Sequence, residues 1–489
     1  MKKKDHSDIQ GCPKNRIETK RGVKWMKKAS AVILTACLAT SAAGCTDSSK
    51  NKEDYEVTIP EYQEDLYVQI FADCPPSGVD EDALQEYFGE AFTGWILTED
   101  GGAITDENGV MTEDYKKRLE LGSKYGDVYI RNHYNYPYYW MNEETTEIDA
   151  YGGVKVTIPK RSITTEFETF EKVKGFYQCD EPSYDAIDTL LPLVEWQNQY
   201  AKDKLFHINL FPSYATGRFS GHSMEEYVQH YVDTVLAKVE TPKTLGLDNY
   251  PLQSSGKENF LRTTYLSDLF TISNIAKEYN SRKDKTSDIT VGFCIQSFID
   301  PGIRDVECKE DISFQTNTCL AMGAKYFEYF LYNTTENMIG ILQNGEKRPL
   351  YDYVKETNEE LQKWDHVIMA FDWLGAMTVD GDDEHENETA FSYVQQQELT
   401  ELRMVKSVKS RLDTLIGEFV DKDGNYGYMT VNYTEPSNHK LDYVTYTFPE
   451  EVRAALVYQN GEAQVYQLEA GQLTLRIESG GAAFVIPCK

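Results

Sequence analysis

The chain has 489 residues, a formal net charge of −31 and 34 tyrosines. This length allows one large domain followed by a smaller one. The excess of acidic residues disfavours nucleic acid and anionic membrane surfaces as partners, so we expect neutral or cationic ones. Six cysteines follow Cys45 without CxxC or Cys/His spacing, so we expect no metal, no cofactor and no essential disulfide.

Residues 1–45 have the composition of an export signal. Met26 starts a short basic stretch, and residues 31–43 form an apolar run too short to cross a bilayer as a helix. The run ends at Gly44-Cys45, which resembles the lipobox of bacterial lipoproteins. We therefore predict lipidation of Cys45 and an extracytoplasmic protein, lipid-anchored to the bacterial cell membrane. An uncleaved anchor is the alternative. Polar residues 46–64 are expected to form a flexible linker.

Residues 65–370 alternate short β-rich runs with amphipathic helical stretches, which is typical of an α/β fold with a parallel sheet. Helices are expected, for example, over Glu225–Val239, Phe260–Tyr279 and Tyr351–Ala370. We predict a (β/α)₈ TIM barrel, with no oligomeric state implied. Its eight strand candidates are Leu66–Phe71, Phe92–Leu97, Val128–Arg131, Gly175–Cys179, Leu205–Leu210, Leu245–Asp248, Thr290–Ile295 and Tyr326–Leu331.

Residues 371–489 are predicted to form a second domain, a small antiparallel β-sandwich. A helical stretch is expected first, and alternating strands begin near Leu415. The Asp423-Gly424 pair predicts a hairpin turn. The strand candidates are Leu415–Val420, Tyr426–Tyr433, Asp442–Phe448, Ala454–Gln459, Gln464–Leu468, Leu473–Ile477 and Ala482–Ile486.

The run GFYQCDEPS, residues 175–183, places two adjacent carboxylates, Asp180 and Glu181, at the end of a predicted strand. Pro182 ends the strand and Ser183 can cap the next helix. Barrel enzymes keep their chemistry at this end of the strands. Glycosidic bond cleavage needs one protonated and one ionised carboxyl group, which such a pair could supply. The alternative is an ordinary turn with a solvated acidic cap.

Other predicted strand ends are rich in polar and aromatic residues. Sugar rings stack on aromatic side chains, and their hydroxyl groups pair with amides and carboxylates. We therefore predict an oligosaccharide or polysaccharide substrate. Beside Asp180, Glu181 and Asp248, the candidate binding residues are Arg131, Asn132, His133, Tyr134, Asn209, Tyr214, Tyr250, Gln296, Tyr332 and Asn333.

The runs FYQCDEPS, HINLFPSYA, LGLDNYPL, CIQSF and CLAMGAKYFEYFLY resemble barrel glycoside hydrolases. The resemblance is greatest to the β-galactosidase-like members of family 42 and to related lipoproteins of gut bacteria. It implies a retaining mechanism, with an acid/base Glu after strand 4 and a nucleophilic Glu after strand 7. Glu181 matches the first position. Gln296 stands at the second, and its amide cannot attack an anomeric carbon.

Three alternatives follow from this departure. Asp248 could act as nucleophile or as the base that activates water. Asp180 and Glu181 could instead work as in hexosaminidases, where the acetamide group of the substrate attacks and the Asp orients it. The barrel could also be a non-catalytic glycan-binding lipoprotein. We favour a cell-surface glycoside hydrolase with Glu181 as general acid/base. Glu328 is expected to be structural, paired with Arg or Lys.

Overall fold

The structure is a computed structural model that describes residues 67–71, 92–97, 110–131, 145–150, 154–159, 167, 170–300, 303–335 and 337–489. The predicted signal, Cys45 and the linker 46–64 lie outside these ranges, as do Asn132, His133 and Tyr134. No helix within the described ranges is both long and apolar enough to span a bilayer.

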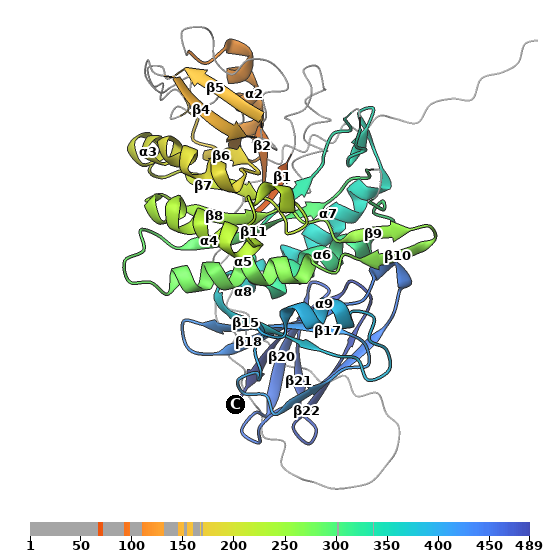
Figure 1. The fold of residues 1–489 in the computed structure, drawn as a ribbon. Helices are drawn as coiled ribbons and strands as arrows, with labels where there is room; N and C mark the ends of the chain where they lie inside the picture. Colours follow the sequence, from red (N-terminus) through yellow and green to blue (C-terminus); the bar gives the residue numbers. More distant parts are fainter. Residues whose placement is uncertain are drawn as a thin grey trace, which may run out of the picture. The chain divides into compact units, whose positions relative to one another are not determined.

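Eight parallel strands close a barrel in the order β1-β12-β11-β8-β7-β6-β3-β2 (Figure 1). The ring closes because β12 pairs with both β1 and β11. Each strand coincides within a few residues with a predicted one, so the predicted α/β barrel is confirmed. The strands are β1 Tyr67–Phe71, β2 Gly94–Leu97, β3 Asp127–Arg131, β6 Val173–Asp180, β7 Leu205–Leu210, β8 Lys243–Leu247, β11 Ile289–Gln296 and β12 Tyr326–Phe330.

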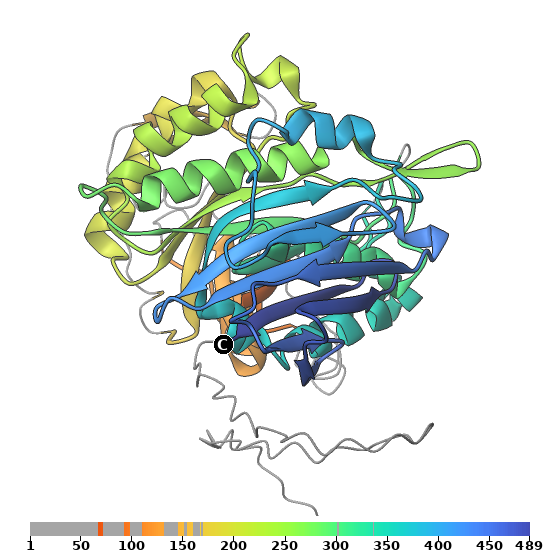
Figure 2. The same cartoon turned by 90° about the horizontal axis from the view of Figure 1, so that it is seen from below.

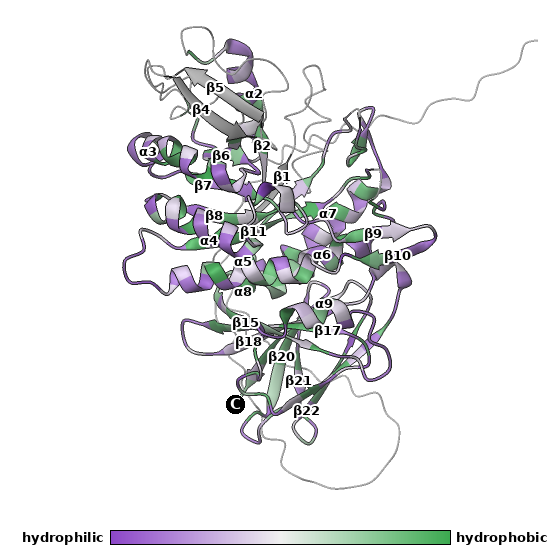
Figure 3. Ribbon diagram, in the orientation of Figure 1, coloured by the Kyte–Doolittle hydropathy of each residue, from purple (hydrophilic) through white to green (hydrophobic). Residues whose placement is uncertain are grey.

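Hydrophilic and hydrophobic segments alternate along the helices between the strands (Figure 3). Helix α4, for example, starts with a capping box between Ser223 and Glu226 and buries Tyr227, Tyr231 and Val232. The α-helices of this part are α2 Glu113–Tyr125, α3 Leu191–Tyr200, α4 Met224–Thr234, α5 Tyr265–Asn280, α6 Lys309–Ala321, α7 Pro349–Leu361 and α8 Asp365–Met369. Short 3₁₀ helices are η3 Tyr184–Leu190, η4 Thr216–Arg218 and η5 Leu236–Lys238.

Three helix predictions need correction. The helix predicted over Glu225–Val239 ends at Thr234, and the short 3₁₀ helix η5 follows it. The helix predicted from Phe260 begins instead at Tyr265, because Phe260 belongs to a hairpin of β9 (Leu252–Ser255) and β10 (Glu258–Leu261). Gly256, at a φ of 68°, lies in the turn of this hairpin, where a left-handed backbone favours glycine. The helix predicted over Tyr351–Ala370 is divided into α7 and α8 at Trp364, whose backbone leaves the helical region.

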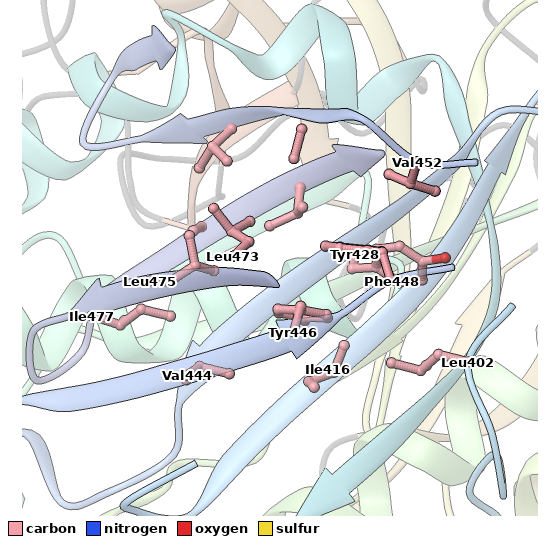
Figure 4. Close-up of a cluster of buried hydrophobic side chains, with 14 residues drawn as sticks. Leu402, Ile416, Tyr428, Val444, Tyr446, Phe448, Val452, Leu473, Leu475 and Ile477 are labelled. Carbon is pink, nitrogen blue, oxygen red and sulfur yellow. The ribbon is translucent and has the colours of Figure 1, made fainter. Parts of the chain in front are cut away.

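The chain from Phe371 onwards forms antiparallel sheets, whose strands run side by side across Figure 2 (blue arrows). One sheet has the order β15-β17-β18-β23-β20-β21, and a second has the order β16-β19-β22. Ile416 and Tyr428 of the first sheet pack with Tyr446 and Leu475 of the second (Figure 4). The predicted sandwich is thus confirmed. Its elements are β15 Phe371–Val379, α9 Glu388–Val394, β16 Ser407–Lys409, β17 Thr414–Asp421, β18 Tyr426–Asn432, η6 Pro436–Asn438, β19 Asp442–Thr447, β20 Ala454–Gln459, β21 Glu462–Gln467, β22 Gln472–Ile477 and β23 Ala482–Cys488.

Strand β15 was not predicted, since a helical stretch was expected after residue 370. Its apolar residues alternate only over part of its length, and a register shift lies between Trp373 and Gly375. The predicted turn at Asp423-Gly424 is present: Asp421 accepts hydrogen bonds from the backbone N–H groups of Asp423 and Asn425, and Gly424 has a φ of 85°.

A buried ion cluster joins the sandwich to the barrel. Arg304, in the loop between β11 and α6, donates to both carboxylate oxygens of Asp311 at 2.8 and 2.6 Å. It also donates to Glu435, next to η6, at 2.5 Å. All three side chains are almost fully buried. This cluster therefore ties a loop at the carboxyl end of the barrel strands to the C-terminal sheets.

Candidate active site

A cavity of about 350 Å³ lies at the carboxyl ends of the barrel strands. Carboxylates and other polar groups line part of its wall, and apolar side chains line the rest. The lining residues are Asp180, Glu181, Asn209, Tyr214, Asp248, Tyr250, Arg262, Cys294, Phe298, Asp300, Ile303, Phe330 and Met338. Barrel enzymes keep their active sites at this end of the sheet, so the cavity is the candidate site.

The chain turns sharply at the end of β6. Glu181 has a φ of 47°, in the left-handed region, and its N–H donates to the carbonyl oxygen of Asn209 at 3.0 Å. The carbonyl of Pro182 accepts a hydrogen bond from the buried hydroxyl of Tyr227 at 2.6 Å. A non-glycine residue in this conformation costs about 1–2 kcal/mol. The turn lets both Asp180 and Glu181 face the cavity, although neighbours on a strand point to opposite sides.

Asp180 is held by two protein groups. Its Oδ1 accepts from the Tyr177 hydroxyl at 2.5 Å, and its Oδ2 accepts from Arg131 at 3.1 Å. Burial raises the pKa of Asp180, while the Arg131 charge and the Tyr177 hydrogen bond oppose that rise. Arg131 therefore contacts a cavity carboxylate but is not itself among the lining residues.

Glu181 and Asp248 form a carboxyl pair that is joined by a hydrogen bond. Two carboxyl groups can share a hydrogen bond only when one of them carries a proton. Burial, followed by the charge of Asp180, raises the pKa of Glu181 from 4.5 to about 8. Burial and the charge of Glu181 raise the pKa of Asp248 well above its usual range. The pair therefore holds a proton at neutral pH.

Two tyrosines and an arginine surround this pair. The Tyr250 hydroxyl donates to Oδ2 of Asp248 at 3.4 Å. The other oxygen of Asp248, Oδ1, is buried and accepts no N–H or O–H from the described side chains apart from the contact with Glu181. Arg262 donates through Nε to the carbonyl of Tyr250 at 3.1 Å, and its guanidinium lies 4.1 Å from the ring centroid of Tyr214. Tyr214 is half exposed, so its face is open to a ligand.

The apolar part of the wall is an aromatic cluster. The Tyr250 and Phe298 rings meet edge to face at 4.9 Å, and Phe298 and Phe330 do so at 5.2 Å. Cys294 lies beneath them, with Sγ 3.7 Å from the Tyr250 hydroxyl. Burial raises the pKa of this thiol, so it is uncharged at neutral pH. This wall suits the C–H face of a sugar or another apolar group.

Six predicted site residues line the cavity: Asp180, Glu181, Asn209, Tyr214, Asp248 and Tyr250. Gln296, Tyr332, Asn333 and Arg131 are not brought to it. Gln296 is fully buried, accepts from the backbone of Leu252 at 3.0 Å and donates to the carbonyl of Arg304 at 3.0 Å. Its amide therefore holds two loops together and does not face the cavity.

Glu328 is buried inside the barrel, but its predicted partner was wrong. His207 Nε2 lies 2.7 Å from one carboxylate oxygen, and the Asn209 amide donates to the other at 2.7 Å. No Arg or Lys pairs with Glu328 among the residues that the structure describes. Because the same Asn209 lines the cavity, Glu328 fixes the orientation of a cavity amide from below.

Sequence reasoning missed seven lining residues: Arg262, Cys294, Phe298, Asp300, Ile303, Phe330 and Met338. Asp300 had a usable signal, since it follows Gln296 by four residues in the loop after strand β11. Arg262 had none, because it was expected within a helix starting at Phe260 and the hairpin β9–β10 that brings it back to the cavity was not predicted. No cluster of three or more His, Cys, Asp or Glu able to hold a metal occurs among the described residues.

No protein-family model and no curated protein sequence matches the chain. Solved structures of barrel glycoside hydrolases resemble it at low identity. A family 42 β-galactosidase from G. stearothermophilus is 8% identical with a TM-score of 0.47, covering 87% of this chain and 98% of its own. A family 30 endoxylanase from Clostridium papyrosolvens is 8% identical with a TM-score of 0.39, covering 88% and 98%. An α-amylase from Geobacillus thermoleovorans, solved with acarbose, is 10% identical with a TM-score of 0.40, covering 88% and 100%. These matches single out no family, and the predicted likeness to family 42 stays a prediction.

Proposed function

We propose that the protein is a glycoside hydrolase in which Glu181 is the general acid and Asp248 is the second carboxyl group of the reaction. The observation that carries this proposal is the placement of Glu181 and Asp248 in the wall of one cavity at the carboxyl ends of the barrel strands, where burial raises the pKa of both carboxyl groups. A glycosidic oxygen leaves only when it is protonated, and a carboxyl group with a raised pKa can supply that proton.

The cavity also has the groups that a sugar needs. The sugar's C–H face stacks on Tyr214 or on the cluster of Phe298 and Phe330, and its hydroxyl groups pair with Asn209 and Arg262. Asp180 is a positioning residue in this proposal. Both of its oxygens are engaged by the protein, and its charge contributes to the raised pKa of Glu181.

The test is hydrolysis of a panel of 4-nitrophenyl glycosides and natural oligosaccharides by purified residues 46–489. Glu181→Gln keeps the size of the side chain and removes the acid, so kcat is expected to fall by about 10²–10⁴-fold on natural leaving groups. Asp248→Asn is expected to reduce kcat by a similar factor. Glu195→Gln, exposed on α3, and Asp233→Asn, exposed on α4, are matched controls with unchanged activity.

Full activity of Glu181→Gln on substrates with poor leaving groups would remove Glu181 from the role of acid. Binding of glycans by the wild-type protein without cleavage of any of them would leave the alternative, a glycan-binding barrel. Isothermal titration with the same oligosaccharides separates these outcomes.

We further propose that Cys45 is lipidated and that the protein works at the cell surface. The basic start, the short apolar run 31–43 and Gly44-Cys45 support this proposal. Expression of the full chain as wild type and as Cys45→Ala tests it. The wild-type protein should sediment with membranes and the variant should be soluble. A variant that stays with membranes would contradict the proposal.

A further inference from the structure

We propose that the hairpin β9–β10 is an outer sugar-binding subsite of the cavity, where Phe260 stacks on a ring of a glycan chain whose cleaved bond lies in the cavity. This inference rests on the proposed function, because it assigns a chain of several sugar residues to the same site and names a residue that recognises it.

The hairpin begins and ends at the wall of the cavity. Tyr250, just before β9, and Arg262, just after β10, are both lining residues. Between them the chain runs outward and returns as an antiparallel pair of strands. Figure 1 shows that this hairpin projects from the barrel. It is therefore an extension of the cavity wall.

The pairing of the strands places Phe260 on the same face as a cavity residue. Phe260 of β10 lies opposite Gln253 of β9, and Gln253 in turn forms an antiparallel bridge with Ile303. Side chains of residues directly opposite each other in neighbouring antiparallel strands point to the same face. Ile303 lines the cavity, so the face that carries Phe260 continues the cavity wall. Neighbouring strands lie about 4.8 Å apart, which places the backbone of Phe260 about 10 Å from that of Ile303.

A second route also leads from the cavity to Phe260. The guanidinium of Arg262 lies 4.1 Å from the ring centroid of Tyr214, which is itself a lining residue. Phe260 precedes Arg262 by two residues. In an extended chain, residues two positions apart lie on one face at a spacing of about 6–7 Å. Tyr214, Arg262 and Phe260 therefore form a row that starts in the cavity and ends on the hairpin.

The Phe260 ring is open to a ligand. Its side chain is 44% exposed, whereas the next residue, Leu261, is buried. The amide of its cross-strand partner, Gln253, donates to two backbone carbonyl groups at 3.1 and 3.0 Å. An exposed aromatic ring on a polar hairpin suits the apolar C–H face of a sugar. The exposed polar residues of the hairpin are Ser254, Ser255, Lys257 and Glu258.

The C-terminal sandwich holds the hairpin in place. Asn259, next to Phe260, donates through Nδ2 to the hydroxyl oxygen of Ser437 at 3.0 Å. That hydroxyl group donates to Glu435 at 2.9 Å, and Glu435 belongs to the buried cluster around Arg304. The hairpin is thus positioned before a glycan binds, so less conformational entropy is lost when a sugar stacks on Phe260.

The experiment measures hydrolysis of oligosaccharides of increasing length and of the corresponding 4-nitrophenyl monoglycosides. In the wild-type protein, kcat/KM should rise with chain length until the chain reaches the hairpin. Phe260→Ala removes the ring, so the ratio of kcat/KM for the long oligosaccharide to that for the monoglycoside should fall about tenfold. Phe260→Trp, which keeps an aromatic face, should restore this ratio.

Two further measurements complete the design. Tyr393→Ala, which removes an exposed aromatic ring on α9, is the matched control and should leave the ratio unchanged. Titration calorimetry with the same oligosaccharides uses Glu181→Gln, in which hydrolysis is suppressed. Adding Phe260→Ala to this variant should raise the Kd of the long oligosaccharides by a similar factor, about tenfold.

The outcomes separate the subsite from the proposed function. An equal dependence on chain length in the wild type and in Phe260→Ala overturns the subsite and leaves the glycosidase intact. If Phe260→Ala instead changes the mass of the protein in analytical ultracentrifugation, with the same length dependence, the ring belongs to an interface between copies and the subsite is overturned. Binding of long oligosaccharides that Phe260→Ala weakens, without hydrolysis of any of them, supports the subsite and overturns the proposed function. Absence of both binding and hydrolysis overturns both.

Discussion

The carboxyl pair in the cavity and the ion cluster between barrel and sandwich both bury acidic side chains, but only the ion cluster includes a cation. Asp311 and Glu435 both pair with the guanidinium of Arg304, which reaches them at 2.5 to 2.6 Å. Glu181 and Asp248 have no cation in direct contact among the described residues and keep a proton between them.

The charges of the Arg304 cluster hold the structure together, whereas the Glu181–Asp248 pair is suited to proton transfer. A guanidinium that bridges two carboxyl groups fixes their positions, so they give the barrel loop a defined position. A proton shared by two carboxyl groups can be passed on to a substrate. Breaking the Arg304 cluster should therefore lower the free energy of unfolding. Removing one member of the Glu181–Asp248 pair should raise it.

The largest effect is expected from breaking the ion cluster. Arg304→Met leaves Asp311 and Glu435 buried without their cation, so the free energy of unfolding should fall by about 3–5 kcal/mol. Urea denaturation followed by tryptophan fluorescence measures this change. Glu435→Gln, which leaves the Arg304–Asp311 pair intact, should cost less. Equal stability of Arg304→Met and the wild type would remove the structural role of the cluster.

A substitution in the cavity, Glu181→Gln, is expected to raise the free energy of unfolding rather than lower it. The pKa of Glu181 is about 8 in the folded protein and near 4.5 when exposed, so the folded state binds more protons between these values and its stability falls as pH rises. Glu181→Gln removes this penalty, and the free energy of unfolding should rise by about 1–3 kcal/mol at pH 8. At pH 4 the gain should vanish. A variant less stable than the wild type at pH 8 would contradict the assignment.

The pH dependence of kcat tests the role of Glu181 as the acid, and the expected effect is a shift of the pH at which kcat declines. If Glu181 is the acid, kcat should decline above about pH 8, where this carboxyl group ionises. The charge of Asp180 helps to raise the pKa of Glu181, so Asp180→Asn should move the decline to lower pH. A decline at the same pH in both proteins, measured by stopped assays in buffers of constant ionic strength, would show that another group titrates.

The smallest effect is expected at the surface. Lys440 pairs with Glu384 and Glu386 on the sandwich, where both acidic side chains are exposed. Water screens such pairs, so Lys440→Met should change the free energy of unfolding by less than about 1 kcal/mol. Denaturation under the conditions used for Arg304→Met provides the direct comparison, and a loss as large as that of Arg304→Met would contradict the contrast between buried and exposed ion pairs.

Much of the barrel could be predicted because its strands are short apolar runs with clear ends. The ends of these strands placed Glu181, Asp248 and Asn209 at one rim of the sheet, and all three line the cavity. Gln296 also ends a strand, yet its amide turns into the protein to bond Leu252 and Arg304. The direction of a strand's last side chain depends on the loops that cover it, and a single sequence does not reveal these.

Pairs of side chains that lie far apart in the sequence could not be predicted either. Glu328 pairs with His207, 121 positions away in the chain, and Arg304 pairs with Glu435, 131 positions away. Charge alone suggested Arg or Lys beside Glu328. Glu328 lies on β12 and His207 on β7, two strands that are not neighbours in the sheet, and their side chains meet in the interior of the barrel.

The left-handed backbone at Glu181 has a consequence for engineering. A protein selected only for stability would place glycine or asparagine at this turn, because these residues adopt a positive φ with little strain. Saturation mutagenesis of this codon should therefore divide the library into two groups when it is screened for both melting temperature and glycan turnover. Glycine and asparagine should be the most heat-resistant and inactive, while glutamate alone should be active and less stable. Glutamate at position 181 would then provide activity and lower the thermal stability of the protein.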